Sequence, residues 1–202
     1  MRWDRLFADL EARFDDIADE QATAERADRE RVAVGAVRAI QRLSGAVGQP
    51  VTLHLAGGAT IGGRLRTVGP DWLLLAESNG RDALVALSAV TAVQGLTTAT
   101  GQEPTGFSVR IDLRRALRGL ARDRSPVAVG LPGWSGGAEG GQSGGYGSTG
   151  SAEITGTIDR VGADFIEIAV HAAWEPRRPN AVRSVVMVPL GAVVMVRAVP
   201  AG

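Results

Sequence analysis

The chain of 202 residues contains no cysteine and no lysine, and each absence excludes a class of chemistry. Without cysteine the protein has no disulfide, no thiolate metal site and no cysteine nucleophile. Without lysine it has no lysine-based catalysis and no P-loop, because that loop binds phosphate through a lysine. All 22 basic residues are arginines.

Strong net charge and long apolar runs are also missing. The 22 arginines balance 22 acidic residues, so only a local patch can attract a charged partner. The longest strongly apolar stretch without charge, residues 185–196, is too short to span a bilayer. The first residues are acidic where a signal peptide would need an apolar run. We expect a cytoplasmic protein without a membrane partner.

An internal repeat is the strongest positive signal in the sequence. Residues 62–75 (GGRLRTVGPDWLLL) match residues 155–168 (TGTIDRVGADFIEI) without a gap. The alignment places Gly63 on Gly156, Gly69 on Gly162, Asp71 on Asp164 and Trp72 on Phe165. It continues downstream, where residues 84–93 match residues 187–196. Because repeated sequence indicates repeated structure, we expect two copies of one small β unit.

Each copy has the pattern of five short strands. In the first copy Val51, Leu53 and Leu55 alternate with polar residues, which is typical of a strand with one buried face. Gly57-Gly58 and Asn79-Gly80 are hairpin signals between strands. Apolar residues recur at helical spacing before each copy. The expected fold class is mainly β with N-terminal helices (α+β), built as two tandem five-stranded barrels of the SH3-like type.

The same pattern divides the chain into segments. Residues 1–48 are expected to form a helical N-terminal arm and residues 49–96 the first barrel. Residues 97–124 are expected to form a linker and a basic helix, and residues 125–199 the second barrel. The second barrel carries a glycine-rich insertion over residues 130–152. A barrel tolerates such an insertion because the entropy of loop closure grows slowly with loop length.

The N-terminal arm begins with an amphipathic helix. Its apolar residues recur every three or four positions, and its opposite face is mostly acidic. This helix either packs on the protein's own barrel or docks on a protein partner, which includes self-association with a second copy. The candidate protein-binding residues are Trp3, Leu6, Phe7, Leu10 and Phe14.

The basic helix, expected over residues 107–124, carries arginines at four-residue spacing. Like charges at this spacing repel, so we expect another group to compensate them. Either the acidic arm neutralises a solvated face, or the arginines bind phosphates of single-stranded RNA or DNA. Two aromatic residues of the insertion then either anchor it onto the barrel or stack on bases. The candidate nucleic-acid-binding residues are Arg110, Arg114, Arg115, Arg118, Arg122, Trp134 and Tyr146.

No motif in the sequence supports catalysis. Residues 133–137 have the G-x-S-x-G spacing of a nucleophile elbow, but further glycines follow where that motif needs a helix. His54 and His171 occupy different places in the two copies and are expected at the surface. Asp71 and Asp164 each follow a turn, where an aspartate typically caps a backbone N–H. We therefore expect no enzyme, no cofactor, no metal site and no small-molecule substrate.

The second copy resembles a known family. It combines a helix with an arginine-rich end, a Pro-Val strand, a bent second strand and a paired final hairpin, over residues 113–131, 153–168 and 186–196. This combination resembles the Sm-like (LSm) fold, especially its bacterial Hfq-like branch, and residues 37–93 resemble it more faintly. The resemblance implies a small SH3-type β-barrel and the binding of single-stranded RNA on rings.

The residues with which that family binds nucleotides are not present at the aligned positions of this sequence. The family's basic-glycine pair aligns with Ala86-Leu87 in the first copy and with Pro189-Leu190 in the second. The Tyr-Lys-His cluster of its Hfq-like branch aligns with residues 83–85 and 186–188. These apolar side chains bind neither base edges nor phosphates. The family's uridine pocket is therefore expected to be absent from both copies. Two fused copies with large insertions also favour a monomer or dimer over a ring of six or seven subunits.

These observations favour a non-catalytic binding module. The first expected role is a protein-binding adaptor that uses the N-terminal helix or an exposed strand edge. The alternative is an RNA or single-stranded DNA-binding regulator that uses the basic helix. The high arginine, alanine and glycine content indicates a bacterial protein from a GC-rich genome.

Overall fold

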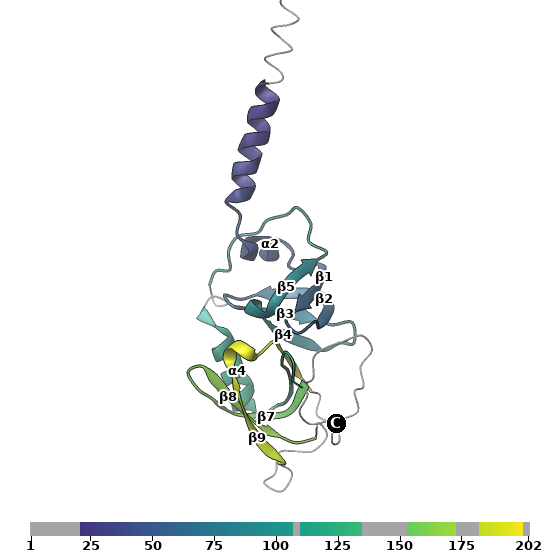
Figure 1. Cartoon of the computed structure of the whole chain (residues 1–202), viewed down its shortest axis with the longest axis vertical. Helices are drawn as coiled ribbons and strands as arrows, with labels where there is room; N and C mark the ends of the chain where they lie inside the picture. Colours follow the sequence, from purple (N-terminus) through teal and green to yellow (C-terminus); the bar gives the residue numbers. More distant parts are fainter. Residues whose placement is uncertain (1–20, 107–109, 135–152, 173–181, 200–202) are drawn as a thin grey trace, which may run out of the picture. The chain divides into compact units, whose positions relative to one another are not determined.

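A computed structural model gives the structure of the chain (Figure 1). It describes residues 21–106, 110–134, 153–172 and 182–199. The chain divides into two compact units, residues 1–39 and residues 40–202. Several candidate residues lie outside the described parts, namely Trp3, Leu6, Phe7, Leu10, Phe14 and Tyr146.

The described part of the first unit is a helix over residues 21–35. Most of its side chains are exposed, including those of Val32 and Val34. Ion pairs join Glu25 to Arg29 at 3.1 Å and Asp28 to Arg31 within the helix. Pairs at this spacing support a helix that is surrounded by solvent.

The rest of the chain consists of two halves of similar order. The first half contains α2 (Ala39–Gly45), β1 (Pro50–Leu55), β2 (Thr60–Val68), β3 (Trp72–Ala76), β4 (Asp82–Ala86), the 3₁₀ helix η1 (Leu87–Ala89) and β5 (Val90–Gln94). The second half contains α4 (Leu113–Asp123), β6 (Pro126–Gly130), β7 (Glu153–Val161), β8 (Phe165–Val170), β9 (Ser184–Pro189), the 3₁₀ helix η2 (Leu190–Ala192) and β10 (Met195–Ala198).

The ten strands within the described residues belong to one antiparallel sheet with the order β5-β1-β2-β3-β4-β10-β6-β7-β8-β9. The expected class, mainly β with helices, is confirmed. The strands form one continuous open sheet instead of two separate sheets, because β4 of the first half pairs with β10 of the second. The two ends of the sheet, β5 and β9, do not pair with each other.

The internal repeat is present in the backbone. Each half has the same strand order, and the β2–β3 and β7–β8 ladders have register shifts at matching places. The N–H of Leu87 donates to the carbonyl of Asp71 at 2.9 Å. The aligned N–H of Leu190 donates to the carbonyl of Asp164 at 2.7 Å. The two copies therefore share hydrogen bonds as well as sequence.

A glycine beneath an aromatic ring explains the most similar part of the repeat. A Cβ added at Gly69 would lie 2.3 Å from the ring of Trp72, and one at Gly162 would lie 2.4 Å from the ring of Phe165. A side chain cannot occupy that space without moving the ring. The equivalent positions of Trp72 and Phe165, which the alignment predicts, are thus confirmed.

The sequence signals for strands and hairpins in the first half are also confirmed. Val51, Leu53 and Leu55 are buried, and the intervening residues of β1 are less so. Both glycines of the turn between β1 and β2 have positive φ, 82° at Gly57 and 84° at Gly58. This backbone conformation costs little only for glycine.

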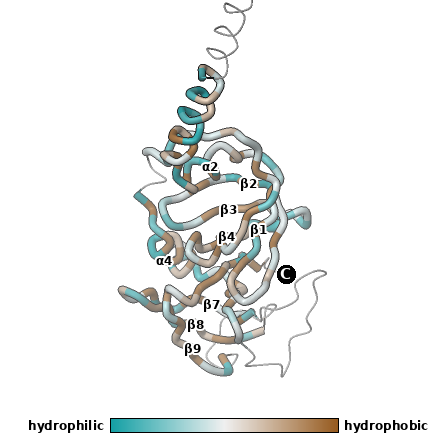
Figure 2. Tube along the Cα trace, turned by 45° about the horizontal axis from the view of Figure 1, so that its top comes forward, coloured by the Kyte–Doolittle hydropathy of each residue, from teal (hydrophilic) through white to brown (hydrophobic). Residues whose placement is uncertain are grey.

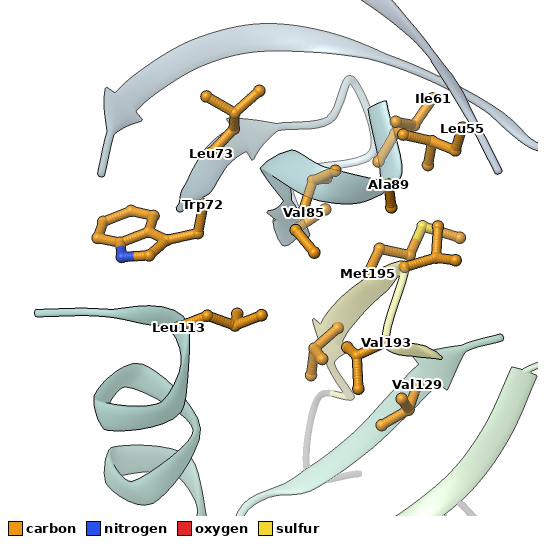
Figure 3. Close-up of a cluster of buried hydrophobic side chains, with 14 of the residues drawn as sticks. Leu55, Ile61, Trp72, Leu73, Val85, Ala89, Leu113, Val129, Val193 and Met195 are labelled. Atoms are coloured by element: carbon orange, nitrogen blue, oxygen red, sulfur yellow. The ribbon is translucent and has the colours of Figure 1, made fainter. Parts of the chain in front are cut away.

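One continuous hydrophobic core contains side chains from both halves. Figure 3 shows Trp72, Val85 and Leu113 with Val129 and Met195 in this core. In Figure 2, which is coloured by hydropathy, the apolar residues of β3 give this strand a hydrophobic colour, whereas α4 contains both hydrophilic and hydrophobic residues. The helix α4 contributes its apolar face through Leu113 and Leu117.

The expectation that both histidines lie at the surface was wrong for His171. This residue, which directly follows β8, is only 2% exposed. One ring nitrogen, Nε2, lies 2.8 Å from the hydroxyl of Thr157, and Nδ1 lies 2.9 Å from the carbonyl of Ala172. Burial is tolerated because both ring nitrogens have a hydrogen-bonding partner.

Candidate interaction surfaces

The two end strands of the sheet are the first candidate surface. Within the described residues, β9 pairs with β8 alone and β5 pairs with β1 alone. Each strand therefore has an outer edge whose main-chain groups have no strand partner there. Such an edge is a template for pairing with another strand.

The hydrogen bonding of β9 shows which of its main-chain groups point outward. The bond from Leu190 N to Asp164 O, 2.7 Å long, identifies one hydrogen-bonded pair of the β8–β9 ladder. Bonded pairs alternate along an antiparallel ladder. By this alternation Val186 and Val188 bond to β8, while the N–H and C=O groups of Val185 and Met187 point away from it.

The side chains along this edge are apolar and exposed. Val185 and Met187 are each 60% exposed, whereas Val188 is buried in the core. Edge strands usually carry charged residues or prolines that discourage pairing. The described residues of β9 have no charged side chain, and their one proline, Pro189, stands at the end of the strand.

The junction between β4 and β10 shows how such an edge is covered inside the same chain. Met195, Val196 and Arg197 pair with Val85, Leu84 and Ala83, respectively, and Ala86 N donates to Val194 O at 3.0 Å. Antiparallel main-chain pairing and apolar side-chain contacts join the two halves at this point.

A cluster of three charges reinforces this junction. The guanidinium of Arg197 on β10 donates from Nε to Glu77 at 2.8 Å, and it also pairs with Glu153 of β7. The exposed fractions of the Arg197 and Glu77 side chains are only 17% and 9%. Because charges are costly to bury alone, the pairing restricts β10 to one position between the two halves.

The start of α4 is held by acidic side chains. Asp112 is the N-cap, and its Oδ1 accepts from Arg115 N at 2.7 Å. Asp71 accepts from Leu113 N at 2.8 Å. Asp71 therefore does cap a backbone N–H, as predicted, but it caps the helix of the other half instead of its own turn.

The expected basic helix is shorter than residues 107–124. α4 begins at Leu113, and its N-cap Asp112 has extended backbone angles, so Arg110 lies before this helix and is not part of it. The row of arginines with four-residue spacing is therefore broken before Arg114. This correction removes one arginine from the face that was expected to contact phosphates.

The remaining candidate arginines differ in their contacts. Arg114 lies 3.5 Å from the carbonyl of Ala163, and the guanidinium of Arg115 donates to the carbonyl of Arg110. Arg118 and Arg122 are exposed and have no ion pair within the described parts of the chain. The helix thus leaves two guanidinium groups for an external anion.

Trp134 lies at the start of the glycine-rich insertion. It is partly buried and packs against the core. This contact is the one expected for an aromatic anchor of the insertion. Its predicted partner in base stacking, Tyr146, lies outside the described residues.

An open hollow of about 380 Å³ lies beside the start of α4. It is lined by Asp71, Ser88, Asp112, Leu113, Arg114, Ala163, Leu190 and Gly191. Both carboxylates of this hollow accept main-chain N–H groups at the start of α4. They are therefore explained by helix capping, and the hollow gives no independent sign of a ligand.

Two further searches of the described residues were negative. They contain no group of three or more His, Cys, Asp or Glu side chains that could hold a metal ion. None of their helices is both long and apolar enough to cross a membrane.

The comparisons with known proteins add no identification. No protein-family model matches the sequence, and no curated protein is significantly similar to it.

The open edge of β9 was only partly visible in the sequence. An exposed strand edge was predicted as a possible protein-binding surface, but no particular strand was singled out. The apolar run of residues 185–188 was the available signal. A run of this kind also occurs in strands that are buried between neighbours, so the pattern alone does not distinguish an edge.

Proposed function

We propose that the protein is a non-catalytic, cytoplasmic protein-binding adaptor, and that it binds its partner through the outer edge of β9. The observation that carries this proposal is the exposure of Val185 and Met187, 60% each, on a strand with one open edge. An extended partner segment would add a strand there, with main-chain hydrogen bonds for affinity and apolar contacts for specificity. The N-terminal helix stays a predicted second contact.

We also propose that both halves derive from one Sm-like barrel. Support comes from the matching strand order, register shifts and glycine–aromatic contacts of the two halves. Ala83 and Val85, which occupy places of the family's polar cluster, are buried in the core. Their burial supports an adaptor over an RNA-binding protein of the usual Sm-like kind.

A photo-cross-linking experiment tests the adaptor. A benzophenone amino acid replaces Met187 in cells that produce the protein, and a matched variant carries it at Arg160, an exposed residue of β7. We expect covalent protein adducts from position 187 after irradiation and about tenfold fewer from position 160. Equal yields at both positions, or no adduct at position 187, would contradict the proposal.

Nucleic-acid binding is the second candidate function. The observation in its favour is the pair of exposed arginines on α4, Arg118 and Arg122, without ion pairs in the described residues. Arg114 on the same helix could add a third phosphate contact. Three contacts to a single strand predict that log affinity falls with log salt at a slope of about −2, at roughly 0.7 per contact.

A salt titration with mixed-sequence RNA and DNA oligonucleotides tests this candidate. The double variant Arg118→Gln with Arg122→Gln should reduce the slope to about −0.7, because one contact is left. Absence of binding at low salt, with a folded protein, would reject the nucleic-acid function.

A further inference from the structure

We propose that Asn79 is a site of spontaneous deamidation, and that the carboxylate formed there loosens the junction between β4 and β10. Asn79 and Gly80 lie in the turn between β3 and β4, and both residues are exposed. An asparagine followed by glycine is especially labile, because no side chain hinders the approach of the next main-chain nitrogen to the carboxamide. The chain contains one other asparagine, Asn180, which precedes an alanine.

The reaction is an intramolecular attack by a main-chain nitrogen. The nitrogen of Gly80 loses its proton to a solvent base and bonds to Cγ of Asn79, which gives a cyclic succinimide. The bond between Cγ and Nδ2 breaks, and this nitrogen takes a proton from water and leaves as ammonia. Water then opens the ring at either of its carbonyl groups, so residue 79 ends as aspartate or isoaspartate. Water is the only co-reactant consumed.

Contacts within the turn hold the carboxamide of Asn79 in position. Its Oδ1 accepts from the main-chain N–H of Arg81 at 2.9 Å, and its Nδ2 donates to Oε2 of Glu77 at 2.9 Å. When the nitrogen of Gly80 attacks, negative charge develops on Oδ1, and an N–H group already aimed at that oxygen stabilises it. A Cβ added at Gly80 would meet no atom within 4 Å, so the space around this residue is open to solvent base.

Hydrogen bonds that close the turn oppose the reaction. Gly80 N donates to the carbonyl of Glu77 at 3.1 Å, and this bond must break before the nitrogen attacks. Glu77 N also donates to the carbonyl of Arg81 at 2.8 Å. Exposed turns open far more often than the core does, because few buried contacts hold them. We therefore expect a slow reaction whose rate follows the opening of this turn.

Glu77 connects the turn to the junction between β4 and β10. Its Oε1 accepts from Nε of Arg197 at 2.8 Å, while its Oε2 accepts from Asn79. Arg197 lies on β10, which pairs with β4, and it also contacts Glu153 of β7. The amide of Asn79 is thus the first member of a series of polar contacts that ends at Glu153. It satisfies one oxygen of a carboxylate whose side chain is only 9% exposed.

Deamidation replaces this hydrogen-bond donor with a charged acceptor. A carboxylate at position 79 has no N–H for Glu77, and the two negative groups would face each other where 2.9 Å separates the present atoms. The cluster already has two carboxylates for the one guanidinium of Arg197, so a third carboxylate adds net repulsion. The isoaspartate product also lengthens the main chain within the turn by one carbon atom. Both products favour separation of Glu77 from Arg197.

The change works in one direction, because the ammonia is lost and the amide is not regenerated. Opening of the turn frees the nitrogen of Gly80, and reaction at Asn79 then weakens the contacts of Glu77 that hold the turn beside β10. Older molecules therefore have a looser junction than newly made ones. The turn acts as a chemical timer on the pairing of the two halves.

Ageing of the purified full-length protein tests the site. The protein is incubated at mildly alkaline pH, which promotes loss of the Gly80 proton, and is then digested after arginine. Mass spectrometry follows peptide 67–81, which contains Asn79, and peptide 178–183, which contains Asn180 and is the control in the same sample. We expect residue 79 to react several-fold faster than residue 180 and to give both aspartate and isoaspartate. Equal rates at the two positions, or no reaction at residue 79, would overturn the proposal.

Two full-length variants separate the new charge from the loss of the amide. Asn79→Asp introduces the carboxylate, and Asn79→Ser removes the amide without adding a charge. We expect Asn79→Asp to unfold at a lower urea concentration than Asn79→Ser, with a difference that shrinks at high salt because ions screen the repulsion. Aged parent protein should likewise unfold at a lower urea concentration than fresh protein. Equal urea midpoints of the two variants, or an unchanged midpoint after deamidation, would show that residue 79 does not act on the junction.

Discussion

At the scale of single residues, close packing explains why particular positions of the repeat are alike. Gly69 and Gly162 lie so close to the rings of Trp72 and Phe165 that a methyl group has no room. The Nε1 of Trp72 donates to the carbonyl of Ile111 at 2.7 Å, which connects the first half to the segment before α4.

Replacing Gly69 with alanine is therefore expected to destabilise the protein. The new Cβ would lie 2.3 Å from the Trp72 ring, so the ring must move, and overpacking of this kind costs about 1–3 kcal/mol. Urea denaturation measures the change in the free energy of unfolding. The matched control is Gly119→Ala in α4, where an added Cβ meets no atom within 4 Å.

Gly119→Ala should stabilise the protein by about 0.5–1 kcal/mol, because alanine loses less conformational entropy than glycine in a helix. A loss of stability at both positions, or at neither, would show that contact with the Trp72 ring is not the cause.

At the scale of elements, β10 is the strand on which the two halves depend. It pairs with β4 on one side and β6 on the other, so it belongs to both ladders. Its side chains Met195 and Val196 are buried, and Arg197 holds acidic residues from each half. This short strand can join the two halves because main-chain hydrogen bonds, burial of apolar side chains and ion pairing all act along it.

We predict that Arg197→Ala lowers the free energy of unfolding by about 3 kcal/mol, because it leaves the largely buried carboxylate of Glu77 without its cation. The control is Arg160→Ala. That arginine is 77% exposed and pairs with Glu167 at 3.6 Å, so its loss should cost less than about 1 kcal/mol. Chemical denaturation of both variants gives the comparison, and similar losses would contradict a special role for Arg197.

At the scale of the whole molecule, the two halves of the sheet share one core and lie in one compact unit, residues 40–202. Neither half has a complete set of neighbours on its own. Ala83 and Val85 of β4 are fully buried, and β10 pairs with both of them. The halves should therefore unfold together.

Two truncations test this dependence. Residues 40–202 alone should unfold in one cooperative transition, because they form a compact unit by themselves. Residues 1–112 should show no cooperative transition, because they lack both β10 and α4. Circular dichroism in urea distinguishes the two results. A cooperative transition in residues 1–112 would mean that the first half is independent.

The sequence alone determined the features that depend on near neighbours in the chain. Alternation in β1, positive φ at Gly57 and Gly58, and the equivalence of Trp72 with Phe165 all follow from short-range sterics and from the repeat. The lack of cysteine and lysine likewise excluded whole classes of chemistry.

Only the tertiary structure decided which strands and side chains meet across long sequence separations. The pairing of β4 with β10, the cap that Asp71 provides for α4 and the burial of His171 each join residues that no local pattern relates. The candidate site, the outer edge of β9, also depends on tertiary structure. The apolar sequence of a strand is the same whether its edge is open or paired with another strand, so the sequence does not identify an edge strand. Among the strands that the structure describes, β9 keeps an open edge because the following strand, β10, pairs with β4 and β6 instead.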